Sequence, residues 1–233
     1  MIYDIADLRI NIENKLPFTA RFCEGYLSPD QESEPAFSVK VTNEQFFKEK
    51  EISDKFSDGY IENICLYRNI CNLMPYYDRF LLHSSVVEYD GKCYAFLGHS
   101  GAGKSTHSRL WLKYLENAKI LNGDKPIVRE SEEGYIAYGT PWMGKEGMGY
   151  KGKGKIYAIC FIEQALKNEI IPLSASLTAD RLFSQILLPD DAESVMKTMT
   201  MADNFIKRVP SFVLKCDISE EAFRTSFDVL TRC

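Results

Sequence analysis

The first part of the chain alternates between apolar and polar positions. The alternation runs through MIYDIADLRINI (1–12) and returns in AFSVKVT (36–42), with the polar stretch SPDQESEP (28–35) between them. A period of two is typical of half-buried strands, and a polar stretch that contains proline is typical of a turn. Residues 1–55 are therefore predicted to form a small β-rich segment that packs on the rest of the chain.

Helical spacing replaces this alternation further along. Apolar residues recur at roughly helical intervals through residues 58–74, with Ser57 or Asp58 as the N-cap and a proline at the end. The stretch FLLHSSVVEYDGKCYAFLG (80–98) then has two apolar strings around an Asp-Gly pair at 90–91, a dipeptide that favours tight hairpins. The pattern predicts one helix followed by a two-stranded hairpin.

Periodicity also predicts the elements that follow. They are a helix at 105–118, a buried strand from 119 that ends at Asp124, a β-rich stretch at 133–142, a strand at 155–164, helices at 178–188 and 190–209, a strand at 211–218 and a helix at 219–230. The order of strand, glycine-rich loop, helix and strand is typical of α/β proteins. Residues 56–233 are therefore predicted to form one α/β domain.

Composition narrows the class of protein. The chain has 233 residues, 45% hydrophobic residues and a formal net charge of -5, with acidic and basic residues mixed along its length. This length suits one domain with a small extension, and the charge argues against non-specific binding of nucleic acid or of an anionic membrane. The first residues lack the pattern of a signal peptide and no apolar run could span a bilayer, so we expect a cytoplasmic protein.

The seven cysteines are scattered along the chain, and most of them lie in apolar strings such as YAICFI. No CxxC pair occurs. We expect reduced thiols that pack as small hydrophobic side chains, and neither a disulfide framework nor a zinc site.

The stretch GHSGAGKST (98–106) follows the second strand of the predicted hairpin. Its spacing matches the full pattern of a phosphate-binding P-loop, Gly-x-x-x-x-Gly-Lys-Ser. Glycines let successive backbone N–H groups turn inward around a phosphate, and the N-terminus of the next helix adds positive potential. The residues expected to bind the nucleotide are Gly98, His99, Ser100, Gly101, Ala102, Gly103, Lys104, Ser105 and Thr106.

Side chains in and near this motif are candidates for chemistry. Lys104 is expected to reach the outer phosphates of ATP, and Ser105 is expected to bind Mg²⁺. Asp124 is the candidate for a second carboxylate beside the metal, with an ordinary turn aspartate as the alternative. His83 closes another strand fifteen positions before Gly98, so an adjoining strand can bring it to the same sheet edge; a structural histidine is the alternative. Loop geometry accounts for the other two histidines.

A second unusual segment is rich in glycine and lysine. Five glycines and four lysines lie between Gly144 and Lys155, which predicts a mobile, cationic loop without a core of its own. Two interpretations stay open. The loop can close over the ATP phosphates, with Lys145 stabilising charge on the transferred group and Trp142 as an anchor or stacking platform. Alternatively it is a solvated hairpin tip whose lysines contact nothing.

The block from LLHSSVV to LNGD (81–124) resembles the P-loop core of HPr kinase/phosphorylase, and more closely the small bacterial proteins related to that kinase. The resemblance is specific over about residues 81–147, weaker toward the C-terminus and absent over roughly the first 55 residues. It implies a mixed central sheet with flanking helices, a fold shared with ATP-dependent phosphoenolpyruvate carboxykinase. It also implies ATP and Mg²⁺ as cofactors, and it leaves a homo-oligomer open because HPr kinases assemble as hexamers.

The resemblance bears on individual residues as well. HPr kinase has a histidine at the position of His83, and a PW-x-GK segment recurs at the position of 141–145, which favours functional roles for His83 and Lys145. The family carries paired aspartates at a strand end, one of them credited with proton transfer and with making the reaction reversible. Here the matching pair is Gly123-Asp124. This departure puts phosphorylase activity and efficient base catalysis in doubt.

Together these features predict an ATP-dependent kinase that transfers the γ-phosphoryl group to a hydroxyl, with serine of a protein, a peptide or a small molecule as the expected acceptor. The predicted catalytic residues are His83, Asp124, Lys104 and Lys145. Related small kinases imply a serine of a modified peptide precursor as one acceptor, whereas HPr itself is disfavoured by the different N-terminal region. The alternative is a nucleotide-binding regulatory module with slow ATPase activity. A carboxykinase would need a longer chain and further ligands.

Overall fold

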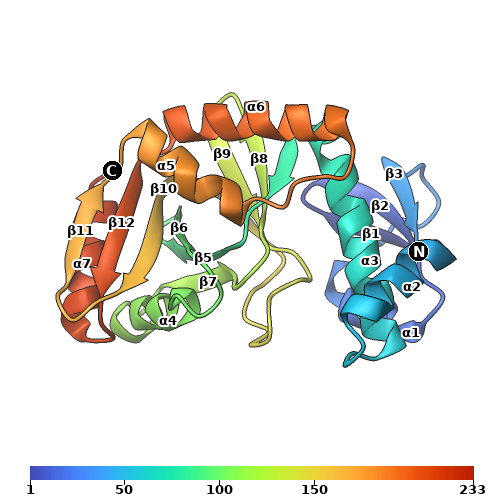
Figure 1. Cartoon of the computed structure of the whole chain (residues 1–233), viewed down its shortest axis with the longest axis horizontal. Coiled ribbons are helices and arrows are strands. Elements are labelled where there is room, and N and C mark those ends of the chain that lie inside the picture. Colours follow the sequence, from blue (N-terminus) through green and yellow to red (C-terminus); the bar gives the residue numbers. More distant parts are fainter.

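The computed structural model describes all of residues 1–233, and its N-terminal part is a small sheet with three helices (Figure 1). β1 (Ile2–Ile5) pairs antiparallel with β2 (Leu8–Glu13), and β2 pairs parallel with β3 (Phe37–Lys40). The helices are α1 (Pro17–Phe22), α2 (Asn43–Ile52) and α3 (Asp58–Leu73). Alternate side chains of the strands, such as Ile10 and Ile12, are fully buried, as a period of two requires.

A nine-stranded sheet with parallel and antiparallel pairs forms the centre of the remaining chain. Its strands are β4 (Arg79–Leu81), β5 (Ser84–Tyr89), β6 (Lys92–Leu97), β7 (Lys119–Asn122), β8 (Ile127–Ser131), β9 (Gly134–Tyr138), β10 (Lys153–Gln164), β11 (Glu169–Pro172) and β12 (Ser211–Cys216). Their spatial order is β4-β8-β9-β10-β6-β5-β7, with β12 beside β10 and β11 beside β12. The long strand β10 pairs with β6, β9 and β12 along different parts of its length, and the sheet is curled (Figure 1).

Helices cover both faces of this sheet. α4 (Lys104–Tyr114) and α7 (Glu220–Leu230) pack on one face through a core that includes Trp111 and Phe223. α5 (Ala175–Leu182) and α6 (Ala192–Arg208) pack on the other, with Leu182 and Phe205 in the core. Short 3₁₀ helices are η1 (Glu24–Tyr26), η2 (Met74–Tyr77) and η3 (Phe183–Gln185). The architecture is mixed α/β.

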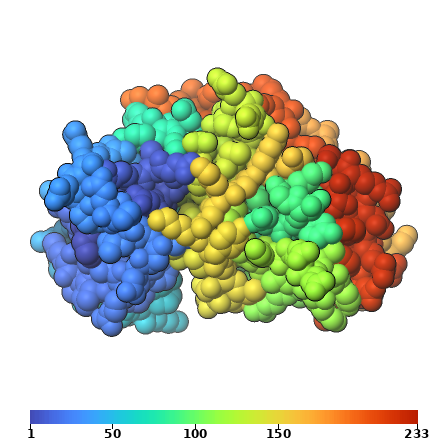
Figure 2. Space-filling model, turned by 180° about the vertical axis from the view of Figure 1, so that it is seen from behind, coloured from blue at the N-terminus to red at the C-terminus, as the bar shows by residue number.

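A third buried cluster joins the small sheet to the large one. It contains Ile5 and Ile10 of the small sheet, Leu66 of α3, and Tyr138 and Trp142 from the larger part. In the space-filling view the yellow segment that includes residues 139–153 lies between the blue N-terminal residues and the rest of the chain (Figure 2). The N-terminal residues thus pack on the larger part, whereas a domain boundary at residue 55 stays a prediction.

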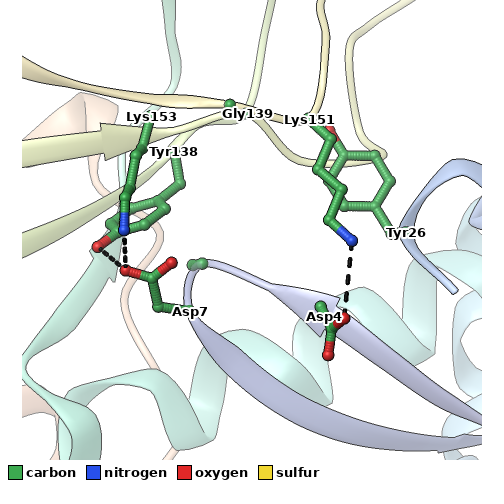
Figure 3. Close-up of a pocket in the computed structure, with 9 residues that line it drawn as sticks. Asp4, Asp7, Tyr26, Tyr138, Gly139, Lys151 and Lys153 are labelled. Carbon is green, nitrogen blue, oxygen red and sulfur yellow. Dashed lines mark hydrogen bonds and ion pairs between the residues drawn. The ribbon is translucent and has the colours of Figure 1, made fainter. Parts of the chain in front are cut away.

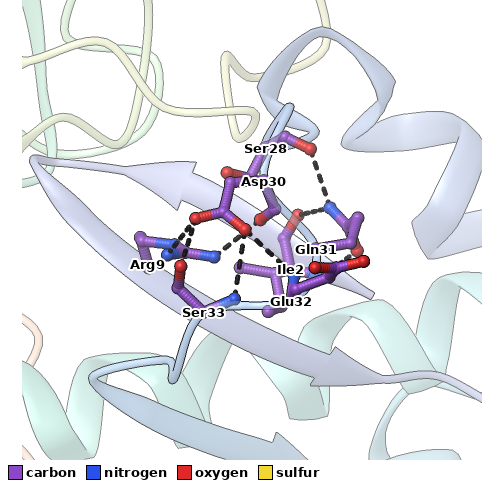
Figure 4. Close-up of polar contacts among 7 residues, drawn as sticks. All are labelled: Ile2, Arg9, Ser28, Asp30, Gln31, Glu32 and Ser33. Atoms are coloured by element: carbon purple, nitrogen blue, oxygen red, sulfur yellow. Dashed lines mark hydrogen bonds and ion pairs between the residues drawn. The ribbon is translucent and has the colours of Figure 1, made fainter.

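The segment after η1 covers the outer edge of β1 (Figure 4). Gln31 Nε2 donates to the carbonyl oxygen of Ile2 at 2.8 Å, and the N–H of Ile2 donates to Gln31 Oε1 at 2.9 Å. Arg9 Nη1 pairs with Asp30 Oδ2 at 2.8 Å. The polar stretch 28–35, which the sequence indicates as a turn, therefore also takes the place of a strand partner at this edge.

The pattern of the sequence locates most of these elements. α3 begins after Ser57, whose side chain accepts from the N–H of Tyr60, and the hairpin turn has positive φ at Asp90 (50°) and Gly91 (70°). The order of strand, loop, helix and strand around the glycine loop is also as predicted.

Three predictions about elements are wrong in detail. The strand after α4 ends at Asn122 and not at Asp124, because the Asn122 side chain bonds to the following backbone and turns it. The helix predicted at 178–188 spans Ala175–Leu182, with Ser174 as its cap. The helices α1 and α2 and the strand β11 are absent from the prediction, since they are short or carry little apolar periodicity.

All seven cysteines are free, and all but Cys233 are buried, which confirms their prediction as core thiols. Burial raises the pKa of Cys93 to about 12, so this thiol is neutral. None of the helices combines the length and the apolar character that a membrane crossing requires.

Candidate active site

Strand pairing brings three segments to one edge of the large sheet. β5 pairs antiparallel with both β6 and β7, so the start of β5 lies beside the ends of these two strands. Ser84, the first residue of β5, is opposite Leu97, the last residue of β6. Consequently His83, the glycine loop after β6 and the Gly123-Asp124 turn after β7 leave the sheet at the same edge.

The glycine loop lies between β6 and α4, and three of its glycines have left-handed backbone angles. Its positive φ angles are those of Gly98 (145°), Gly101 (82°) and Gly103 (110°). Lys104 Nζ donates to the carbonyl oxygens of Gly98 at 2.7 Å and His99 at 3.3 Å, so the ammonium group lies against the loop. Gln164, at the end of β10, donates to the carbonyl oxygen of Gly101 at 2.8 Å. The loop is therefore fixed from within and from the neighbouring strand.

The N-terminal end of α4 has the positive groups that an anion would need. Lys104 is its first residue and is 8% exposed. Burial lowers the pKa of the Lys104 ammonium below its ordinary value, and the negative charge of Asp124 opposes part of that shift. Ser105 is half-buried and Thr106 is exposed. A phosphate at this end would meet unpaired helix N–H groups, the positive end of the helix dipole and one ammonium group.

The other loop residues shape its surface. His99 and Ser100 are exposed, and His99 Nδ1 lies 2.8 Å from the carbonyl oxygen of Ser100. Ala102 is buried beneath the loop, where a Cβ at Gly98 would lie only 2.9 Å from its methyl group. Position 98 therefore requires glycine for space as well as for its φ angle.

His107 belongs to the hydrophobic core. It is 2% exposed, and its Nε2 lies 2.9 Å from Ser226 Oγ on α7. Burial lowers the pKa of His107 to about 4, so its ring is neutral at physiological pH. This histidine fastens α4 to α7.

Asn122 shapes the turn that carries Asp124. It is fully buried, and its Oδ1 accepts the backbone N–H groups of Asp124 at 2.9 Å and Lys125 at 2.7 Å. Its Nδ2 donates to the carbonyl oxygen of Thr140 at 3.2 Å, and Thr140 Oγ1 donates to the carbonyl oxygen of Lys125 at 2.7 Å. Asn122 is not among the residues predicted from the sequence, although an Asx residue two positions before a candidate site residue is a recognisable turn signal.

His83 and Asp124 are in contact across this edge. His83 Nε2 lies 3.2 Å from Asp124 Oδ1, and both side chains are partly exposed, at 33% and 25%. Burial disfavours the charged carboxylate, but the interaction with His83 and the charges of Lys125 and Lys104 outweigh it, so the pKa of Asp124 is below its ordinary value. The predicted proximity of His83 to the glycine loop edge is thus present, while its role stays a prediction.

Lys125 is a further cation at this edge, and it is not among the predicted site residues. Its Nζ lies 3.8 Å from Asp124 Oδ2 and 5.0 Å from the centroid of the Tyr67 ring. The side chain is thus held between a carboxylate and an aromatic face. Only its position directly after Asp124 could have indicated it.

The 139–152 loop packs along β7 toward Asp124. The N–H of Gly139 donates to the carbonyl oxygen of Gly152 at 2.9 Å and closes the base of the loop, and the N–H of Tyr150 donates to Leu121 at 3.2 Å. At the tip, a Cβ on Gly144 would lie 2.9 Å from that of Asp124. The loop backbone therefore lies directly against the candidate metal carboxylate.

Lys145 lies between two fixed points of this loop. Gly144 contacts Asp124, and Glu146 pairs with Arg109 of α4 at 2.7 Å. The Lys145 side chain itself is exposed and makes no hydrogen bond or ion pair, so both interpretations of it stay open. Other lysines of the segment do have partners, which contradicts a hairpin tip whose lysines all contact nothing. These are Lys151 with Asp4 at 3.8 Å and Lys153 with Asp7 at 2.7 Å.

The loop also occupies the space beside Gly123. A Cβ at this position would lie 2.9 Å from the carbonyl oxygen of Met143 and 3.0 Å from that of Met148. Both oxygens belong to backbone and cannot move as a side chain can. A second carboxylate at Gly123 is therefore incompatible with the observed loop.

Trp142 is an anchor for the loop and not a stacking platform. It is 5% exposed, and its ring centroid lies 4.8 Å from that of Tyr67 on α3. The indole is thus enclosed in the cluster that joins the two sheets. A nucleotide base has no access to a ring buried in this way.

Three arginines that could in principle clamp a phosphate pair with carboxylates elsewhere. They are Arg129 with Asp7 at 3.6 Å, Arg181 with Glu163 at 2.6 Å and Arg208 with Glu130 at 3.5 Å. The edge of the sheet therefore brings together His83, Asp124, Lys104 and the 139–152 loop, and leaves these arginines out.

Comparisons with known proteins give little further guidance. No family model matches the chain, and no curated protein matches it. Among solved structures, the chain is similar to the Hpr(Ser) kinase/phosphatase from Coxiella burnetii, with a TM-score of 0.38 and 8% sequence identity, over 66% of this chain and 99% of that one. The two differ too far for this match to assign a family or a function, so the following proposal rests on the residues themselves.

Proposed function

We propose that this chain is an ATP-dependent kinase that transfers the γ-phosphoryl group to a hydroxyl group, with serine as the expected acceptor. One observation carries the proposal. A full P-loop pattern lies between a strand and a helix, Lys104 lies against the loop, and the His83–Asp124 pair lies at the same sheet edge. A phosphate site beside a histidine and carboxylate is the arrangement that phosphoryl transfer needs.

The residues of the loop fit the triphosphate of ATP. The glycines leave the backbone open, since a Cβ at Gly101 would meet nothing within 4 Å. Lys104 would bind the outer phosphates, and Lys145 would neutralise charge that develops on the transferred group when the 139–152 loop closes over it. A P-loop reads phosphates, so the base of the nucleotide is a matter for experiment.

Ser105 and Asp124 would hold Mg²⁺, which prefers hydroxyl and carboxylate oxygen ligands. When bound, Mg²⁺ neutralises charge on the phosphate oxygens. The pKa of Asp124 is below its ordinary value, so burial does not prevent its carboxylate from being ionised at neutral pH, as a metal ligand must be.

His83 or Asp124 would orient the acceptor hydroxyl. The transition state of phosphoryl transfer is loose, so positioning contributes more than a strong base does. The pair is partly exposed, which leaves room for an acceptor to approach. A serine of a protein, a peptide or a small molecule meets this requirement.

A regulatory module with slow ATPase activity is the second candidate, and Gly123 is the observation that favours it. The paired aspartates implied by the HPr kinase resemblance are reduced here to one, and the 139–152 loop fills the remaining space. Such a protein would bind and slowly hydrolyse ATP without a phosphorylated product.

Transfer of label from γ-labelled ATP distinguishes the two candidates. The purified protein is incubated with size-fractionated extract from its own host, with Lys104→Ala as the control. Label in a protein, peptide or metabolite fraction that requires Lys104 supports the kinase and identifies the acceptor class. Release of free phosphate alone supports the regulatory module. In a confirmed kinase, loss of transfer with retained ATP binding in His83→Ala would assign His83 to the acceptor step.

A further inference from the structure

The 139–152 loop is attached to the rest of the chain at both of its ends. Lys151 and Lys153 extend from the end of the loop toward Asp4 and Asp7 of the N-terminal hairpin, with 3.8 Å and 2.7 Å between the charged atoms (Figure 3). Near the start of the loop, the indole of Trp142 is buried in the cluster that joins the two sheets. These contacts hold the two ends of the loop without any contribution from its tip.

The tip of the loop, residues 144–147, has one side-chain attachment to the rest of the chain. Glu146 Oε2 lies 2.7 Å from Arg109 Nη2 on α4. The other residues of the tip are Lys145, whose side chain forms no hydrogen bond or ion pair, and two glycines. The Arg109–Glu146 pair therefore acts as a latch between the tip and α4.

The latch ends on the face of α4 that carries a candidate metal ligand. Arg109 lies four residues after Ser105, and side chains at this spacing are neighbours on one face of a helix. On the other side of the tip, a Cβ on Gly144 would lie 2.9 Å from that of Asp124. The backbone of Lys145 is thus held between the turn that carries Asp124 and the helix face that carries Ser105.

The two residues of the latch also differ in charge, which separates two possible roles. A rise of 1.5 Å per residue places Arg109 about 6 Å along the helix from Ser105. This is within the distance of about 8 Å over which exposed charges interact at physiological ionic strength. Loss of Arg109 would leave a carboxylate that repels ATP, whereas loss of Glu146 would leave a cation that attracts it. A role in holding the tip, in contrast, is shared by both residues.

We propose that Arg109 and Glu146 are positioning residues, which hold the tip of the 139–152 loop on α4 so that Lys145 faces the transferred phosphoryl group. Both act through Lys145 and contact neither ATP nor the acceptor. The role in phosphoryl transfer rests on the proposed kinase activity, whereas the hold on the tip does not depend on it. The latch is partly exposed, so its loss is expected to have an effect of a few fold.

Hydrogen–deuterium exchange of the full chain tests the hold on the tip without any activity. The N–H of Gly147 donates to the carbonyl oxygen of Gly144 at 3.2 Å, so peptides that cover residues 143–149 report on opening of the tip. Arg109→Gln and Glu146→Gln are each expected to raise the exchange rate there by about two- to fivefold, the size that one exposed ion pair supports.

Two further variants complete this measurement. The swapped variant Arg109→Glu/Glu146→Arg keeps both charges and is expected to bring the exchange rate of the tip back toward that of the wild type. Arg224→Gln is the matched control, because it breaks an exposed ion pair with Glu220 on α7 and is expected to leave the exchange of the tip unchanged.

Consumption of γ-labelled ATP, in the presence of the fraction that accepts label, tests the link to Lys145. Both single variants are expected to lower turnover by about two- to fivefold. The KM for ATP is expected to rise in Arg109→Gln and not in Glu146→Gln, because only the first leaves an unpaired carboxylate. In a Lys145→Ala background, the same substitutions are expected to change turnover no further, since the residue that they position is absent.

The outcomes that contradict each part are different. Unchanged exchange of the tip in both single variants would overturn the hold on the loop. Faster exchange with unchanged or raised turnover, or an effect on turnover that persists in the Lys145→Ala background, would overturn the positioning of Lys145. If the wild type consumes no ATP, the proposed kinase activity fails and the role in phosphoryl transfer fails with it, whereas the exchange rates still decide the hold on the tip.

Discussion

The side chain of Asn122 holds the backbone of Asp124, with 2.9 Å from the Asp124 nitrogen to Asn122 Oδ1. The same oxygen accepts from the N–H of Lys125, and the Asn122 side chain is fully buried. Asn122→Ala removes these bonds and is expected to lower the free energy of unfolding by about 1–3 kcal/mol, since it leaves polar groups without partners. Urea denaturation measures the free energy of unfolding of this variant. Asn117→Ala, at an exposed position, is the control. Equal stability of the two variants would contradict the role of Asn122.

Position 123 requires glycine because the 139–152 loop leaves no space there for a Cβ atom. Ala and Asp at this position place the same Cβ against the carbonyl oxygens of Met143 and Met148. Both substitutions are therefore expected to destabilise the protein by about 1–3 kcal/mol, as overpacking does. Gly25→Ala is the control, because a Cβ there meets nothing within 4 Å. A Gly123→Asp variant with wild-type thermal stability would show that the loop leaves room for a second carboxylate.

Substitution of Lys145 tests whether the 139–152 loop takes part in the proposed phosphoryl transfer. Its backbone is placed beside Asp124, but its side chain is exposed and unpaired. If it stabilises developing charge, Lys145→Ala lowers turnover by about tenfold or more while nucleotide affinity changes less. Steady-state kinetics with titration of ATP separates the two effects, and the exposed Lys167→Ala is the comparison. Unchanged turnover would remove Lys145 from the mechanism.

His107 makes stability depend on pH. Its pKa is lowered from 6.5 to about 4 by burial, so the unfolded chain binds more protons between these values. Stability is therefore complete above about pH 6.5 and is lost as the pH falls toward 4. From pH 7.5 to 5, His107 is expected to cost on the order of 2 kcal/mol of unfolding free energy. Urea denaturation at both pH values should show this loss in wild type and in the exposed-site control His99→Gln, but not in His107→Gln.

Local signals account for what the sequence predicts well. The β5–β6 hairpin follows from two apolar strings around Asp90 and Gly91, whose positive φ angles suit that dipeptide. The glycine loop follows from its spacing and from the strand and helix around it. Proximity of His83 to the loop edge follows from strand order alone.

Contacts between distant segments could not be predicted in this way. The filling of the space beside Gly123 depends on the path of a loop about twenty residues later. The burial of Trp142 depends on α3, and the position of the Lys125 side chain depends on the Tyr67 ring of that helix. Such features require packing between elements, for which a single sequence carries no periodic signal.

Binding of Mg²⁺-ATP to the wild type and to Lys104→Met tests the central claim most directly, because the metal ligands, the loop and the acceptor all depend on a nucleotide at Gly98–Thr106. Methionine keeps most of the buried side chain and removes the charge. The account predicts saturable, Mg²⁺-dependent binding by calorimetry that is at least about tenfold weaker in the variant. No binding to the wild type at millimolar ATP, or equal binding to both proteins, would contradict it.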